Sequence, residues 1–131
     1  GIDYLWQRLE ALGLADQTTV MVNSDFGRTP YYNSNNGKDH WPIGAYLFMG
    51  NGVNGNRVIG ATDENYNQRK INSNTFDADD PNGIYLNTAH VITAAEIMLG
   101  VDETLRQKFA LGEASGYVLD LFNAAKQTSN V

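Results

Sequence analysis

The sequence predicts an α/β fold, and three features lead to this prediction. A run with apolar residues at helical spacing comes first, two runs of strand character follow at residues 18–23 and 43–49, and a second helical run lies near residue 90. The run at 18–23, TTVMVN, is β-branched and apolar without alternation, which is typical of a strand covered on both faces. This order of elements predicts helices layered on a mainly parallel sheet.

The first half of the chain is expected to contain one helix and three strands. The helix is predicted over residues 3–12, and Gly13 is a suitable terminator. The strands are expected at residues 18–23, at 43–49 and, shorter, at 57–62. The residues that recur on the apolar face of the helix are Ile2, Leu5, Trp6, Leu9 and Leu12.

The second half is expected to be a polar surface loop, over residues 63–83, followed by helices. Asn87 or Thr88 can cap the main helix, and Gly100 can close it. Short helices are expected from Asp102 and from about Ser115. The predicted buried face of the main helix consists of Ala89, Ile92, Ala95 and Leu99.

Composition restricts the class of protein and its partners. The 131 residues fit one domain, or part of a larger one, with 42% hydrophobic residues. The net charge of -6, with no run of Lys or Arg, argues against nucleic acid or an anionic membrane surface as a partner. The sequence has no apolar run long enough to span a membrane, and its first residues do not include the apolar region of a signal peptide. Because there is no cysteine, thiol nucleophiles and disulfides are excluded.

The segment NSDFGRTPYYNSNNGKDHW, at residues 23–41, carries the candidate site. Ligands of open α/β sheets bind beyond the carboxyl ends of the strands, and Asp25 follows the first predicted strand. A carboxylate and a neutral imidazole such as His40 are suitable ligands for zinc or similar ions. The planar fork of Arg28 suits a phosphate or sulfate, while Asp39 adjoins His40.

Each of these residues also has a structural interpretation. Asp25 can cap a turn, and Arg28 can form a salt bridge with Asp25 or Asp39. His40 can be a buried histidine bonded to the backbone. For His90, in the last main helix, the structural interpretation is the preferred one.

Two motifs are set aside. The run GNGVNG at residues 50–55 matches the G-x-G-x-x-G motif of dinucleotide-binding proteins. That motif requires a helix to follow, whereas the residues after it have the pattern of a strand. The run DADDPNG at residues 77–83 differs from a calcium loop, because Asn82 and Thr88 occupy the positions of the required Gly and Glu.

The block TTVMVNSDFGRTP…GKDHWPIGAYLFMGNGVNGNRVIGATDE resembles a bacterial family of uncharacterised proteins related to the alkaline phosphatase and sulfatase superfamily. The resemblance is strongest over residues 18–64 and is co-linear in the first helix and at 88–99. It implies that residues 1–131 are a single domain that forms the C-terminal portion of an alkaline-phosphatase-like α/β/α sandwich. It also implies that the nucleophile and several metal ligands belong to an N-terminal part of the parent protein.

The resemblance assigns roles to individual residues. Asp25 and His40 would be metal ligands for zinc, manganese or calcium, Arg28 an anion contact, and Asp39 a partner that orients His40. The sequence departs from the superfamily motif at Phe26, where the superfamily has a ligand histidine and a phenyl ring cannot bind metal.

The resulting hypothesis is the C-terminal part of a metal-dependent hydrolase-like protein for phosphate or sulfate esters, inactive on its own. The alternative is a non-catalytic binding or structural module in which Asp25, Arg28, Asp39 and His40 fasten the loop by hydrogen bonds. The expected partners are the N-terminal part of the parent protein and, through exposed apolar surface, a second copy of the chain. The resemblance implies an exported or periplasmic location.

Overall fold

The structure is a computed structural model that describes residues 1–108 and 119–122. The chain divides into two compact units, one of residues Gly1–Gly55 and one that begins at Asn56. The prediction that residues 1–131 are a single domain of a larger protein stays a prediction.

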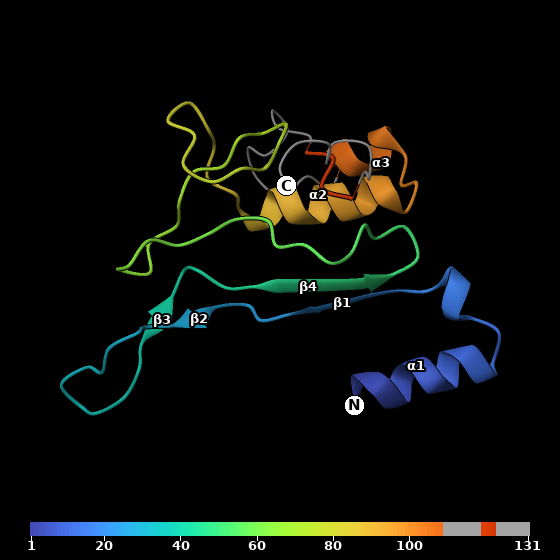
Figure 1. Ribbon diagram of the computed structural model, residues 1–131, viewed down its shortest axis with the longest axis horizontal. Helices are drawn as coiled ribbons and strands as arrows, with labels where there is room; N and C mark the ends of the chain where they lie inside the picture. The colour runs from blue at the N-terminus through green and yellow to red at the C-terminus, as the bar shows by residue number, and fades with distance from the viewer. Residues whose placement is uncertain (109–118, 123–131) are drawn as a thin grey trace. The chain divides into compact units, whose positions relative to one another are not determined.

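The first unit contains the predicted helix and the two main predicted strands at close to their expected positions (Figure 1). Between the main strands lie two further short strands, which pair with each other. In chain order the elements are α1 (Ile2–Ala11), the 3-10 helix η1 (Ala15–Gln17), β1 (Thr19–Asn23), β2 (Gly27–Arg28), β3 (His40–Trp41) and β4 (Tyr46–Gly50).

The predicted mainly parallel sheet of an α/β/α sandwich is wrong. β1 pairs antiparallel with β4, from Thr19 opposite Gly50 to Asn23 opposite Tyr46, and β2 pairs antiparallel with β3. A parallel pair requires a crossover of a dozen or more residues, usually a helix. Here the connection folds back on itself as the β2–β3 hairpin, so the chain returns in the opposite direction beside β1.

β1 also differs from the predicted strand covered on both faces. Met21 is 42% exposed and Val22 is 45% exposed, and in the described residues β4 is its only strand partner. The absence of alternation in TTVMVN therefore indicated apolar character but not double burial.

α1 contacts the β4 end of this strand pair. The Trp6 indole N–H donates to the Met49 sulfur at 3.1 Å, and Gly50, with φ +106°, lies against the Trp6 ring. A Cβ at Gly50 would lie 2.2 Å from the Thr18 carbonyl oxygen, so the position requires glycine. Gly13 ends the helix as predicted, with φ +66°.

The second unit begins with irregular chain rather than with the predicted strand at 57–62. In that stretch Thr62 makes one isolated bridge, to Gln68. The predicted loop at 63–83 is rich in turns, because side chains such as Asp63 accept hydrogen bonds from nearby backbone N–H groups. The largest of these, from the Asn67 N–H, holds the pKa of Asp63 below its ordinary value.

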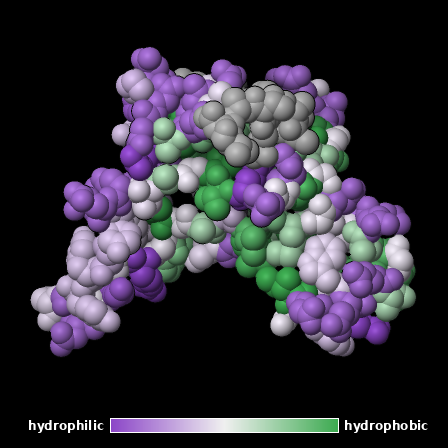
Figure 2. All heavy atoms as spheres, viewed as in Figure 1, coloured by the Kyte–Doolittle hydropathy of each residue, from purple (hydrophilic) through white to green (hydrophobic). Residues whose placement is uncertain are grey.

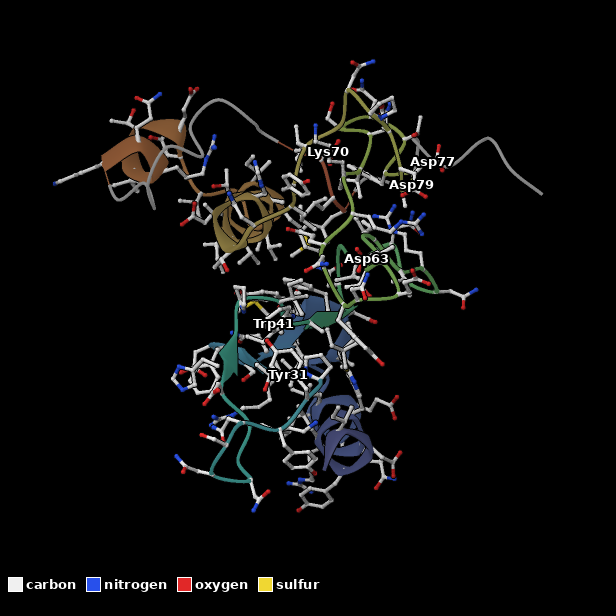
Figure 3. The ribbon with its side chains drawn as sticks, turned by 90° about the vertical axis from the view of Figure 1, so that its left-hand side faces the viewer. Tyr31, Trp41, Asp63, Lys70, Asp77 and Asp79 are labelled. Atoms are coloured by element: carbon white, nitrogen blue, oxygen red, sulfur yellow. The ribbon has the colours of Figure 1, made fainter. Side chains whose placement is uncertain are left out.

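This turn-rich segment also carries part of the core, so it is more than a surface loop. Ile71 is fully buried and forms β-bridges with Ala78 and Ile84. Phe76, which lies between these residues in the sequence, is also buried. The carboxylates of the segment resembling a calcium loop contact neighbouring side chains. Asp77 accepts from Thr75, Asp79 pairs with Arg69, and Asp80 accepts from Asn72. Asp77 and Asp79 are labelled in Figure 3.

The main helix of the second unit, α2 (Thr88–Met98), is capped by Asn87 and followed by Gly100, as predicted. Its buried face is different from the predicted one. The buried residues are His90, Val91 and Ala94, whereas Leu99 is 67% exposed. The predicted face, Ala89, Ile92, Ala95 and Leu99, is therefore wrong.

A short helix α3 (Glu103–Lys108) follows Asp102 as predicted, with the Thr104 N–H donating to the Asp102 carboxylate at 2.8 Å. The helix expected from about Ser115 lies outside the described residues. Within residues 1–108 and 119–122, the structure has no helix of the length and apolar character needed to cross a membrane.

Candidate functional site

The candidate segment forms an antiparallel hairpin of β2 and β3. Gly27 faces Trp41 and Arg28 faces His40, so two predicted site residues twelve positions apart in sequence are direct cross-strand partners. A Cβ at Gly27 would lie 2.0 Å from the Ile43 carbonyl oxygen. Glycine is therefore required for the close approach of the chain beside Arg28.

Thr29 anchors the base of the loop that joins β2 to β3. Its side chain is 4% exposed, and its hydroxyl donates to the Tyr31 carbonyl at 2.8 Å and accepts from the Asp39 N–H at 3.2 Å. The Thr29 N–H also donates to the Asp39 carbonyl at 3.0 Å. These bonds extend the β2–β3 pairing by one residue on each side.

Asn33 organises the tip of the same loop. Its side-chain oxygen accepts from the N–H groups of Asn35 and Gly37, each at 3.0 Å. Its side-chain nitrogen donates to the Asp39 carboxylate at 2.7 Å. The tip is therefore held in one conformation by an Asx turn and a cross-loop bond.

The basic groups of the hairpin lie against aromatic rings. The His40 ring stacks on Phe26 with centroids 3.7 Å apart and planes 23° apart, and the Arg28 guanidinium carbon lies 4.8 Å from the Phe26 centroid. The placement of the Arg28 guanidinium next to the face of this ring stabilises its positive charge. The same pattern recurs at the tip, where the Lys38 ammonium lies 5.3 Å from the Tyr32 centroid.

The aromatic residues nearest the hairpin base also contact one another. Tyr31 and Trp41 meet edge to face with ring centroids 6.2 Å apart, and they lie side by side in Figure 3. Tyr31 remains 58% exposed and Tyr32 is 70% exposed.

The structure brings three of the four predicted site residues together. Arg28, Asp39 and His40 lie on the hairpin, while Asp25 lies just before β2 and is exposed. The Asp25 carboxylate makes no hydrogen bond or ion pair with any of the residues that the structure describes. The turn-capping interpretation of Asp25 therefore has no contact to support it in the described part of the chain.

The structural interpretations of Arg28 and His40 also differ from the observed geometry. Arg28 donates to the Lys38 carbonyl at 3.0 Å and, within the described ranges, pairs with neither Asp25 nor Asp39. His40 is exposed rather than buried. The Asp39 carboxylate is bound by Asn33 rather than by His40. Hydrogen bonds do fasten this loop, but Thr29 and Asn33 make them.

A bound metal would need more donors than the described residues bring together. Over residues 1–108 and 119–122, no group of three or more His, Cys, Asp or Glu side chains is placed to hold an ion. Zinc sites use three or four protein ligands. Stacking on Phe26 covers one face of the His40 ring but does not block the ring nitrogens, which lie at its edge. Asp25 and His40 supply only two donors, so by themselves they are an incomplete set of metal ligands.

Sequence reasoning missed Thr29, Asn33 and Lys38. Asn33 could have been recognised as a turn residue, because Asn side chains commonly bond the backbone two residues further on, which here is the Asn35 N–H. Lys38 and Thr29 have no comparable local signal, because their roles depend on the pairing of β2 with β3. The set-aside motif at 50–55 forms a turn closed by the Val53 N–H and the Gly50 carbonyl at 3.2 Å, and no helix starts there.

Comparison with known families assigns the chain to a family. The family described as protein of unknown function (DUF1501) matches residues 1–80, more than half of the chain and including the whole β2–β3 hairpin. The chain therefore belongs to the DUF1501 family. No curated protein and no solved structure matches it. The match confirms the predicted membership of an uncharacterised family.

Proposed function

We propose that the β2–β3 hairpin is the anion contact of a metal-dependent hydrolase-like protein acting on phosphate or sulfate esters, related to the alkaline phosphatase and sulfatase superfamily. The observation that supports this proposal is the pairing of Arg28 with His40 on an exposed hairpin. Among the described residues no carboxylate forms an ion pair with the Arg28 guanidinium. Its remaining N–H groups are therefore available to bind an external oxyanion.

The rigid loop supports the same proposal. Anion recognition by a planar guanidinium needs a fixed orientation, and the bond from Arg28 to the Lys38 carbonyl supplies one. Lys38 itself adds a second positive charge on a chain whose net charge is -6. The hairpin is thus locally more basic than the rest of the chain, which favours an anionic ligand at this place.

The chain is proposed to be inactive by itself. Ser24 and Thr29 are the hydroxyls nearest the site in sequence, and both donate to backbone carbonyls, of Phe26 and Tyr31 respectively. Neither is therefore activated by a base. Asp25 and His40 would contribute to a metal centre only together with donors from elsewhere, and such an ion would stabilise charge on the ester group.

The test measures thermal melting with inorganic phosphate or sulfate, each with and without zinc, manganese or calcium. The wild type is compared with Arg28→Gln, with His40→Ala and with Arg8→Gln, a control on the exposed face of α1. We expect a rise in Tm with anion that Arg28→Gln abolishes and Arg8→Gln retains. A metal-dependent part of the shift should disappear in His40→Ala.

The alternative is a non-catalytic module, and one observation favours it. Phe26 occupies the position of a superfamily ligand histidine and stacks on His40, so it serves packing where the superfamily would bind metal. Under this alternative neither anion nor metal raises the Tm. An equal anion shift in Arg28→Gln and the wild type would also reject the role of Arg28.

A further inference from the structure

The chain contains four Asn-Gly pairs, and they differ in how the glycine N–H is used. An asparagine followed by glycine is chemically labile, because the next backbone nitrogen can reach the side-chain carbonyl carbon without hindrance from a Cβ. The four pairs are Asn36–Gly37, Asn51–Gly52, Asn54–Gly55 and Asn82–Gly83.

Two of the pairs are protected by hydrogen bonds. The Gly37 N–H donates to the Asn33 side-chain oxygen at 3.0 Å, and the Gly83 N–H donates to the Asp80 carbonyl at 2.9 Å. A nitrogen whose proton is held by another acceptor has to break that bond before it can turn toward its own asparagine side chain.

The pair Asn51–Gly52 is constrained in another way. It forms the centre of the turn closed by the Val53 N–H and the Gly50 carbonyl, with Gly52 at φ +75°. Rotation of the Asn51–Gly52 peptide would break this turn at the end of β4.

The pair Asn54–Gly55 has neither constraint. In the described part of the chain the Gly55 N–H donates to no acceptor, and a Cβ at Gly55 would meet nothing within 4 Å. The backbone nitrogen and the space around it are therefore open for reaction with the Asn54 side chain.

We propose that Asn54 is a site of spontaneous deamidation, selected among the four pairs by this lack of constraint. The Gly55 nitrogen loses its proton and forms a bond to the Asn54 side-chain carbonyl carbon. The bond from that carbon to Nδ2 breaks, ammonia leaves, and a succinimide remains. Water then opens the ring at either carbonyl to give aspartate or isoaspartate, without oxidation or reduction.

The product changes charge and backbone at the boundary of the two units. Each deamidation adds one negative charge three residues before Arg57, to a chain of net charge -6. Isoaspartate also adds one methylene to the main chain, next to Gly55, the last residue of the first unit. The modification therefore acts on the segment that joins the units.

Peptide mapping of the native protein after incubation at mildly alkaline pH tests the proposal. Trypsin distributes the four pairs over three peptides, with Asn36 in 29–38, Asn51 and Asn54 together in 39–57, and Asn82 in 71–106. Fragment masses should place the first product at Asn54, with little change at Asn36 and Asn82. In urea all four pairs should react at comparable rates, because the folded constraints are gone.

The matched control is Gly55→Ala. Gly55 is not in the left-handed region and has space for a Cβ, so alanine should leave the Tm unchanged. The methyl group should suppress the product at Asn54 several-fold by hindering the attack. Native-state reaction that is as fast at Asn36, Asn51 or Asn82 as at Asn54, or an unchanged rate in Gly55→Ala, would overturn the proposal.

Discussion

Thr29 shows how one buried hydroxyl sets the geometry of the candidate site. It lies between Arg28 and the loop, and its hydroxyl satisfies a carbonyl on one side and an N–H on the other. Because Thr29 is 4% exposed, water cannot replace either partner without opening the hairpin. The orientation of Arg28 therefore depends on the hydrogen bonds of a buried neighbouring residue.

Thr29→Val is expected to destabilise the first unit by about 1–3 kcal/mol, the typical cost of leaving a buried donor or acceptor without its partner. Valine keeps the shape and removes both hydrogen bonds. The midpoint of urea unfolding measures the effect. Thr18→Val is the control, since its hydroxyl bond to the Leu14 carbonyl is solvent-exposed, and it should cost less than about 0.5 kcal/mol. Equal costs for the two variants would contradict this account.

The N-terminus of the α2 helix depends on a reciprocal cap between Asn87 and His90. The Asn87 side chain accepts from the His90 N–H, and the His90 Nδ1 accepts from the Asn87 N–H, each at 3.1 Å. An imidazole nitrogen accepts only when it carries no proton, so the cap requires neutral His90. Burial lowers the pKa of His90 below its ordinary value of 6.5, which is consistent with this requirement.

This cap predicts that acid weakens the fold. Because the pKa of His90 is lower in the folded state, the unfolded chain binds the proton first as the pH falls. The stabilisation is complete above about pH 6.5 and is lost as the pH falls through the folded value. His90→Gln keeps an acceptor for the cap but does not titrate. Tm measured from pH 7.5 to 5, values chosen to span this titration, should fall more in the wild type than in His90→Gln; parallel curves would contradict the prediction.

At the scale of the whole molecule, apolar side chains remain at the surface. Val22 and Leu47 on the β1–β4 pair are exposed, as are Leu5 and Leu12 on α1. Figure 2 shows apolar groups, in green, on the surface of the molecule. Val22 and Leu47 are opposite each other in the β1–β4 register, so their exposed side chains lie side by side, and adjoining exposed apolar side chains are a feature of contact sites.

Self-association is therefore expected, and sedimentation equilibrium over a range of concentrations measures it. The apparent mass of the wild type should rise with concentration, and Val22→Lys should reduce the rise by placing a charge on the strand pair. Val58→Lys is the matched control in the second unit, because Val58 is 91% exposed and the same charge is added. A constant monomer mass, or equal effects of the two variants, would count against association through β1–β4.

The amino-acid sequence by itself determined the helices and strands that depend on local preference. α1, β1, β4 and α2 lie close to their predicted positions, and the cap at Asn87 and the glycines at 13 and 100 act at the expected ends. These features depend on hydrogen bonds and backbone angles within a few residues. The membership of an uncharacterised protein family was likewise predicted from the sequence motifs, and the DUF1501 match confirms it.

Only the tertiary structure decided how those elements pair and which faces are buried. The apolar run of β1 suits a parallel or an antiparallel partner equally well, and the direction is set by β4, more than twenty residues away. α2 is apolar on several sides, so spacing could not select His90, Val91 and Ala94 as its buried face. The pairing of Arg28 with His40 was also outside the reach of strand patterns, because the register of this hairpin is set by the bonds that close its loop, from Thr29 to Asp39 and from Asn33 to Gly37.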